Sequence, residues 1–245
     1  MSLHNRRRTL PRTRGRVSVL LGAMMLISSA CAGAAAQSRS DPELQRVLGR
    51  MEAVGKTFRT FTAELLQKKY TAVLGEFGTP EFGEFYYARA ADGSALLRQD
   101  IRSPGRKITT IQGGTATIYQ PDIKQAVVYN LGNNKDKVEY LALGIGQSPA
   151  KLQENFDIAR LPDENLDGTP CSVLVFKPRN PRAASLFATI TLWVKKSGAI
   201  PIQQKLEEPG GDYLLVRFSR EKLNSAIPSS KFEQKLPADT DIQRY

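Results

Sequence analysis

The sequence contains one histidine, His4, and two cysteines, Cys31 and Cys171. Because His4 and Cys31 lie in a segment that we expect to be removed, the exported chain would have no imidazole and one thiol. This excludes hydrolysis by a histidine-activated nucleophile, histidine acid–base catalysis and histidine-bound zinc. No intramolecular disulfide can form either. Cys171 lies in an apolar run, which predicts a buried structural cysteine.

Phosphate-binding glycine loops are absent as well. Gly113-Gly114 and Gly210-Gly211 each lie between predicted strands, with no helix after them to present backbone amides. Carboxylates are the remaining candidate catalysts, but Asp163, Glu164 and Asp167 supply too few oxygen ligands for calcium. The simpler interpretation of these three is a solvated turn. We therefore predict a binding protein rather than an enzyme, with no catalytic residue, no metal and no cofactor.

Residues 1–36 have the composition of a secretory signal peptide. Six arginines and no acid precede an apolar run, Val17–Ile27, which is too short to span a bilayer as a mature helix. Small residues follow, and cleavage after Ala36 fits the Ala-x-Ala pattern. An alternative keeps Cys31 as a lipid-modified N-terminus, because Ser29-Ala30-Cys31 resembles the end of a lipobox. The first interpretation predicts a periplasmic protein, and the second a lipid-anchored one.

Residues 37–245 are then expected to form a single domain with its own core. Removal of the six arginines lowers the formal net charge from +11 to +5. The remaining lysines and arginines are scattered rather than grouped with aromatic residues, which argues against nucleic acid as a partner. A weak attraction to anionic lipid head groups stays open.

Hydrophobic periodicity predicts one good helix and many short strands. Leu44, Val47, Leu48 and Met51 have helical spacing within Pro42–Phe58, and weaker helices are expected at Lys135–Gly146 and Ser148–Asn155. A strand begins near Phe61, and Lys68–Thr79 is expected to be a hairpin or loop. Further strands are predicted around 85–89 and at 95–101, 106–112, 115–120, 125–130, 156–161, 171–178, 187–195, 200–208 and 212–220.

About ten strands in up-and-down order should curl, because strand twist accumulates across a wide sheet. The predicted fold is therefore α+β, mainly β, an unclosed antiparallel half-barrel with a helical lid over its concave apolar face. Apolar stripes such as Ile190, Leu192 and Val194 fit either an ordinary core or a cavity for an apolar ligand. Three helices are few to cover so wide a sheet, which favours the cavity.

Several motifs occur in the order of a known family. Phe58–Gln67 (FRTFTAELLQ) is followed by Gly83–Arg89 and Leu97–Asp100, and then by a longer run, Gly113–Tyr129, with Ile118-Tyr119, Pro121 and Lys124-Gln125. Phe232–Ile242 (FEQKLPADTDI) supplies a closing strand with its proline. This arrangement resembles the LolA/LolB-like superfamily of bacterial lipoprotein carriers, and its LolA-type carriers in particular.

The resemblance implies a carrier that encloses lipoprotein acyl chains in an apolar cavity and moves them from the inner to the outer membrane. An inner-membrane ABC transporter and an outer-membrane receptor are the implied partners of a monomeric carrier without enzymatic activity. The candidate cavity walls are Phe61, Leu65, Phe85, Tyr87, Ile118, Val128, Ile190, Leu192, Leu214 and Val216. Arg89 stands where the carriers have a functionally important arginine, although Ala90 replaces the proline that follows it there. Arg89 is therefore the candidate for gating the lid, and the alternative is a surface arginine at the end of a hairpin.

Two other functions fit the same fold. A half-barrel of this kind can serve as an envelope-stress regulator that binds a partner protein instead of carrying cargo. It can also serve as an anchored receptor of the LolB type, if Cys31 carries lipid.

Overall fold

The computed structural model describes residues 41–131, 143–145 and 148–245. These residues belong to one compact unit, Ala34–Tyr245. The predicted signal peptide lies outside the described residues, and so does most of the helix predicted at Lys135–Gly146. The neighbouring prediction, a helix at Ser148–Asn155, is confirmed by α4, Pro149–Asn155, with Ser148 as its N-cap.

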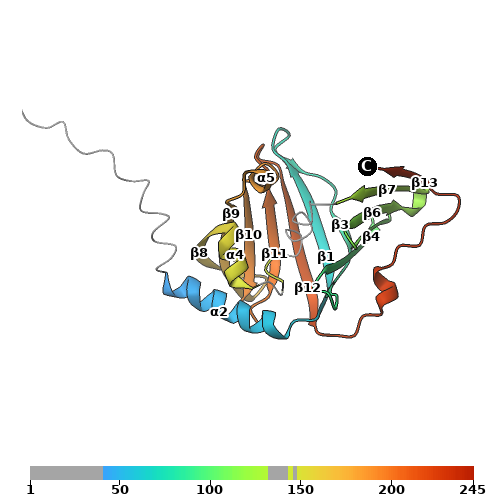
Figure 1. The fold of residues 1–245 in the computed structure, drawn as a ribbon. Coiled ribbons are helices and arrows are strands. Elements are labelled where there is room, and N and C mark those ends of the chain that lie inside the picture. Colours follow the sequence, from blue (N-terminus) through green and yellow to red (C-terminus); the bar gives the residue numbers. More distant parts are fainter. Residues whose placement is uncertain (1–40, 132–142, 146–147) are drawn as a thin grey trace, which may run out of the picture. The chain divides into compact units, whose positions relative to one another are not determined.

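Helix α2, Pro42–Thr57, forms where the periodicity predicts it (Figure 1). The Asp41 carboxylate accepts hydrogen bonds from the backbone amides of Glu43 and Leu44, at 2.9 and 3.3 Å, which satisfies amides that have no partner within the helix. Its apolar stripe is buried, and Met51 is 2% exposed. The helix thus covers part of the core rather than standing free in solvent.

Across the described residues, thirteen strands form one sheet. They are β1 (Thr60–Thr71), β2 (Glu76–Phe77), β3 (Glu81–Arg89), β4 (Ala95–Ser103), β5 (Lys107–Gln112), β6 (Thr115–Gln120), β7 (Gln125–Asn130), β8 (Phe156–Leu166), β9 (Thr169–Pro178), β10 (Thr189–Lys195), β11 (Pro201–Glu207), β12 (Tyr213–Leu223) and β13 (Asp241–Arg244). The short helices are η1 (Pro121–Ile123), α5 (Pro181–Ala184) and η2 (Ser229–Phe232).

The strand order is β13-β7-β6-β5-β4-β3-β1-β12-β11-β10-β9-β8, with β2 paired to β1 beside this path. All pairs are antiparallel except β13 with β7. The first and last strands of the order are not paired with each other, so the sheet is unclosed, as predicted. Strand β1 lies at its centre, between β3 and β12, and joins two strands that are far apart in the chain.

The sheet is larger than the sequence predicted. Periodicity predicted eleven strand positions, about ten in the fold prediction, and β2 and β13 bring the described sheet to thirteen. Strand β13 begins at the end of Phe232–Ile242, where the resemblance implies a closing strand, and the strand near 85–89 starts earlier than predicted. Strand β1 continues to Thr71 and pairs with β2, so the hairpin or loop predicted at Lys68–Thr79 is a hairpin. Strand β8 continues past a bulge to Leu166, so Asp163 and Glu164 lie in a strand rather than in a turn.

The two faces of the sheet differ in what covers them. The inner face carries Phe61, Phe85 and Leu192, and together with α2 and α4 it holds the main hydrophobic core. The outer face of β4 and β5 is covered by the C-terminal segment, where η2 packs and Phe232 is buried. Each strand therefore alternates between the two faces, as half-buried strands do.

Candidate functional site

A cavity of about 220 Å³ lies against the inner face of the sheet. Its lining combines apolar and polar side chains from seven strands: Leu65, Gln67, Phe85, Leu97, Gln99, Lys107, Thr109, Ile118, Gln204, Leu214, Val216 and Phe218. The register explains why these side chains meet. Leu65 lies opposite Phe218, Gln67 opposite Val216, and Phe85 opposite Gln99.

Half of the predicted wall residues line this cavity, namely Leu65, Phe85, Ile118, Leu214 and Val216. Phe61, Tyr87, Ile190 and Leu192 are buried in the same core without being part of the lining. Val128 pairs with Thr117, whereas Val127 pairs with Ile118. Because Ile118 is on the inner face, the register places Val127 there and Val128 on the outer face.

Three phenylalanines form an aromatic cluster at the apolar end of the cavity. The ring centroids of Phe61 and Phe218 are 5.6 Å apart, those of Phe85 and Phe218 are 5.1 Å apart, and those of Phe61 and Phe85 are 6.1 Å apart. Edge-on and tilted contacts of this kind add to the stability that burial alone provides. The cluster gives the cavity a rigid wall with no hydrogen-bonding group.

The other end of the cavity is polar, which the sequence analysis missed. Gln99 donates from Nε2 to the Gln67 Oε1 atom at 2.7 Å, and Gln67 in turn donates to Glu81. Lys107 Nζ lies 2.6 Å from Glu81 Oε1. The signal was present in the alternation, since Gln67 follows Leu65, and Gln99 follows Leu97, on the same side of a strand.

A short segment, Leu143–Ile145, fills part of the space in front of the inner face. Leu143 and Ile145 are each 1% exposed. Gly144 has φ +79°, and a Cβ there would lie 2.7 Å from Leu192 Cδ1, so this close approach requires glycine. The Gln204 side chain, 1% exposed, donates from Nε2 to the Leu143 carbonyl oxygen at 3.2 Å. Packing therefore holds the segment, and the hydrogen bond from Gln204 adds to it.

Replacing Gln204 by leucine removes that hydrogen bond and leaves the buried Leu143 carbonyl without this donor. We expect the free energy of unfolding to fall by about 1–3 kcal/mol, the cost of a buried polar group without its partner. Urea unfolding followed by tryptophan fluorescence measures the change. The matched control is Gln203→Leu on the outer face of the same strand, where a change of about 0.5 kcal/mol or less is expected. Equal effects of the two variants would contradict the role given to the hydrogen bond.

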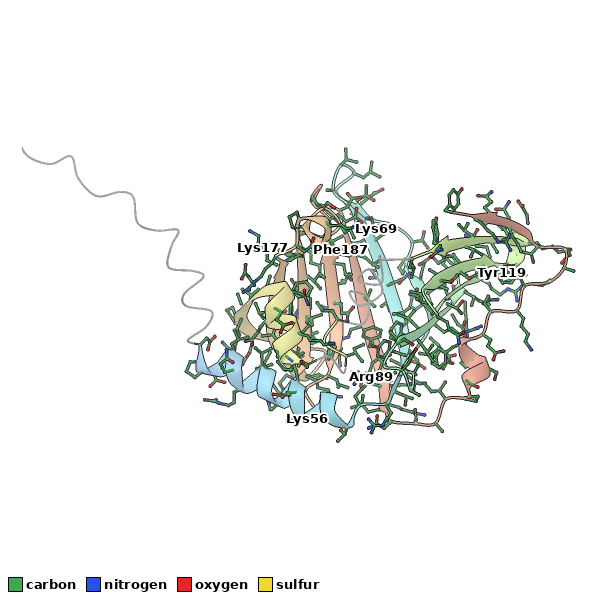
Figure 2. All side chains as sticks on the ribbon, in the orientation of Figure 1. Lys56, Lys69, Arg89, Tyr119, Lys177 and Phe187 are labelled. Carbon is green, nitrogen blue, oxygen red and sulfur yellow. The ribbon has the colours of Figure 1, made fainter. Side chains whose placement is uncertain are left out.

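Arg89, the predicted gating residue, ends β3 at the junction of α2 and β1. Its backbone amide donates to the Arg59 carbonyl oxygen at 3.0 Å, and its guanidinium lies 5.8 Å from the centre of the Phe58 ring. The side chain is exposed. Figure 2 shows Arg89 and Lys69 toward opposite ends of the sheet. Arg89 thus lies at the end away from Lys69 and the hairpin tip, and its gating role stays a prediction.

A larger hollow, of about 600 Å³, lies on the outer face between β1, β3, β12 and residues 225–231. Its lining is strongly charged and includes ion-paired side chains: Arg220 with Glu64 at 2.8 Å, and Lys231 with Asp100 at 2.9 Å. An apolar ligand would have to be placed against these ion pairs at a cost in desolvation. The smaller inner cavity is therefore the better candidate for a hydrocarbon.

The carboxylates considered as catalysts are held by structural contacts. The hydrogen bond from Lys196 holds the pKa of Asp163 below its ordinary value, and Glu164 accepts a hydrogen bond from Trp193 Nε1 at 2.7 Å. Within the described ranges, no three His, Cys, Asp or Glu side chains are grouped closely enough to hold a metal ion. Cys171 is fully buried, as predicted, and burial raises the pKa of its thiol.

The family model described as "Outer membrane lipoprotein carrier protein LolA" matches residues 56–235. The chain belongs to the LolA family. A relative named outer-membrane lipoprotein carrier protein, from Pseudomonas entomophila, is 24% identical over 222 residues, covering 89% of this chain and 96% of its own length. The protein of the same name from Pseudomonas putida KT2440 is 23% identical with the same coverage. The resemblance seen in the motifs is thus confirmed at the level of the family.

A solved structure has a similar fold. An uncharacterized conserved protein from Thermus thermophilus superimposes with a TM-score of 0.51 at 14% identity, covering 83% of this chain and 99% of that one. At this identity the likeness supports the fold and nothing further. Among the described helices of the LolA-family chain, none combines the length and the apolar character that a membrane crossing requires.

Proposed function

We propose that this protein is a carrier that holds the acyl chains of lipoproteins in the inner-face cavity and moves them from the inner to the outer membrane. The observation that supports this most directly is the apolar cavity walled by Phe85, Phe218 and Leu97 in a chain of the LolA family. A protein with this task needs no catalytic group, and we propose that it is not an enzyme.

The energetic requirement explains why a cavity is needed. Burying one methylene away from water is favourable by about 0.8 kcal/mol. Exposing an acyl chain of some fifteen methylenes to water therefore costs on the order of 12 kcal/mol of free energy. Free transit through an aqueous compartment is therefore very unfavourable. An enclosed apolar surface removes most of that cost while keeping the binding reversible.

The cavity as it stands is small for this cargo. Its volume of about 220 Å³ is below the range of roughly 300–1,000 Å³ that is usual for pockets of drug-sized ligands. Leu143 and Ile145 are buried in the same core, and the Leu143 carbonyl oxygen accepts a hydrogen bond from the cavity-lining Gln204. We infer that loading displaces these two side chains, so that the ligand takes the apolar contacts they give up.

The cellular setting is part of the same proposal. Residues 1–36 would direct export and be removed, and residues 37–245 would work as a single periplasmic domain and as a monomer. An inner-membrane ABC transporter would supply the cargo and an outer-membrane receptor would accept it. Arg89, at the α2–β1 junction, is the residue we propose for gating, and unchanged cargo release by an Arg89→Leu variant would remove it from this role.

Placing a charge in the cavity tests the proposal. Ile118 is half-buried and lines the cavity, whereas Ile123 is 58% exposed in η1. We expect Ile118→Glu to lower the affinity for a synthetic triacylated cysteinyl lipopeptide at least tenfold, because a buried carboxylate would be desolvated by the bound chain. Ile123→Glu should bind as the unmodified protein does. Binding is measured by displacement of N-phenyl-1-naphthylamine, a neutral apolar dye.

Unmodified protein that neither binds the lipopeptide nor carries lipid when it is isolated from cells would overturn the carrier function. Depletion in cells separates the alternatives. Lipoproteins should accumulate at the inner membrane if the protein is a carrier, and should not if it is a regulator. A native N-terminus at Gln37 would exclude the receptor anchored through Cys31.

A further inference from the structure

The polar end of the cavity is one connected group of side chains on four neighbouring strands. Gln67 is on β1, Glu81 on β3, Gln99 on β4 and Lys107 on β5, and hydrogen bonds link them in the order Lys107, Glu81, Gln67, Gln99. All but Glu81 line the cavity itself. Gln67 is 9% exposed, so the group reaches from the buried wall toward the more open Lys107.

This group has hydrogen-bond donors left to offer. The Lys107 ammonium has three N–H groups, and one of them serves the 2.6 Å contact with Glu81. The Gln99 amide has two N–H groups, and one of them serves the 2.7 Å contact with Gln67. Within the described part of the chain, these are the side-chain hydrogen bonds that the two residues donate. Both side chains are therefore placed to donate to an acceptor that enters the cavity.

The charge of the group limits what that acceptor is. Glu81 balances Lys107, and the glutamines are neutral, so the cluster has donors without a net positive charge. An anionic head group would gain little attraction from a lysine whose charge is already compensated. A neutral oxygen acceptor, such as an ester carbonyl, can instead take the spare N–H groups without a charge of its own to desolvate.

The arrangement of the two ends gives a bound amphiphile a direction. Along β4, Leu97 precedes Gln99, and Leu97 lies opposite Ile111 while Gln99 lies opposite Thr109. Along β5, Lys107 and Thr109 precede Ile111 on the same face. Gln67, Glu81 and Lys107 thus lie toward the end of the sheet where β1 and β2 form their hairpin. Gln99 lies level with Phe85, and Leu97 lies one inward-facing position further along β4. An amphiphile fits with its chains against Leu97 and the aromatic cluster and its linkage at Gln99 and Lys107.

We propose that Gln99 and Lys107, held by Gln67 and Glu81, form a subsite for the carbonyl oxygens that join acyl chains to a glyceryl head group. This inference rests on the proposed carrier function and adds to it a recognition step. If the subsite exists, the protein binds an acyl ester more tightly than a plain hydrocarbon of equal length. The chains provide affinity and the carbonyl contacts fix how deeply the ligand enters.

The test compares two neutral lipids that differ only in the carbonyls. One is 1,2-dipalmitoylglycerol, an ester, and the other is 1,2-dihexadecylglycerol, the ether with equal chains. The exported chain should bind the ester about tenfold more tightly, a ratio that corresponds to about 1.4 kcal/mol. Displacement of N-phenyl-1-naphthylamine and native mass spectrometry both report the binding, and palmitate serves as an anionic third ligand.

Two variants locate the preference. Gln99→Leu and Lys107→Met, made singly, should each reduce the ester preference to about threefold or less while leaving the ether affinity within about twofold. The matched control is Lys205→Met, because Lys205 is also a half-buried lysine paired with a carboxylate, Glu207 at 2.7 Å, but it lies outside the cavity. This control should keep the full preference. If one variant fails to fold, the other still carries the test.

Each outcome has a distinct meaning. Equal binding of ester and ether by the unmodified protein would overturn the subsite and leave the carrier function standing. Tighter binding of palmitate than of the ester would overturn it too, in favour of an anion site. Failure to bind any of the three lipids would overturn the subsite, and the carrier function would fall with it only if the lipopeptide is not bound either and no lipid is carried by protein isolated from cells. An ester preference that survives in both variants would show that other groups provide it.

Discussion

Truncation of Phe218 to alanine is expected to lower the free energy of unfolding by about 3–5 kcal/mol. The side chain is 2% exposed, and its ring contacts both Phe61 and Phe85. Its removal takes away the burial of a large apolar group and leaves a void that rigid aromatic neighbours fill poorly. Urea unfolding followed by the fluorescence of Trp193, the single tryptophan, measures the loss.

The Phe218→Ala variant also connects stability to ligand binding. The void left by the phenylalanine ring adjoins the cavity, so a bound hydrocarbon can occupy part of that void and recover some of the lost contacts. Dipalmitoylglycerol should therefore raise the stability of Phe218→Ala more than that of the unmodified protein. Phe82→Ala is the control, because Phe82 is 50% exposed and a cost below about 1 kcal/mol is expected there. A small effect at Phe218 would mean that the aromatic cluster is not a packed wall.

Replacing Gly83 by alanine is expected to be at least as damaging as an overpacked core, at roughly 3 kcal/mol or more. An added Cβ would lie 2.0 Å from the Asp100 carbonyl oxygen and 2.9 Å from Ile101 Cα. These are backbone atoms of the neighbouring strand β4, so no side-chain rotation relieves the clash. The register of β3 and β4 shifts between Phe82 and Gly83, and this irregularity lets the two backbones approach so closely.

Gly49→Ala provides the comparison for this result. Gly49 lies within α2, and an added Cβ there meets no atom within 4 Å. Alanine in a helix interior should stabilise the protein by about 0.5–1 kcal/mol. The two glycine variants thus differ in the sign of their effect. A mild result at Gly83 would show that the β3–β4 pair adjusts its register without cost.

Much of the fold follows from alternation in the sequence. Strands such as Thr60–Thr71 and Thr189–Lys195 bury every second residue over most of their length, so their burial period is visible in the residues. Strand β13 could not be found in this way. Asp241–Arg244 is mostly exposed, and it is a strand because its backbone pairs with β7, a contact that periodicity does not report.

The candidate site shows the same limit. Phe85 and Val216 were predictable as wall residues because they stand in regular apolar stripes. Val128 was placed on the wrong face because Val127 and Val128 are consecutive and equally apolar, and only the pairing with β6 distinguishes them. Gln67 and Gln99 interrupt apolar stripes, and their meaning depends on a hydrogen bond between strands that are distant in sequence.

The place of β1 in the middle of the sheet has a consequence for how the chain acquires its structure. Leu65 lies opposite Gly83 on one side and Phe218 on the other, so β1 pairs with one strand close to it in sequence and with another much later in the chain. Such high contact order slows folding, because the entropy of closing a long loop is lost before the paired strands contribute stabilising free energy. The two parts of the sheet on either side of the β1–β12 pair, β13 to β1 and β12 to β8, are therefore expected to join late in folding. If the chain is exported as we propose, this delay keeps it unfolded for longer, which is the state in which a polypeptide passes through a translocation channel.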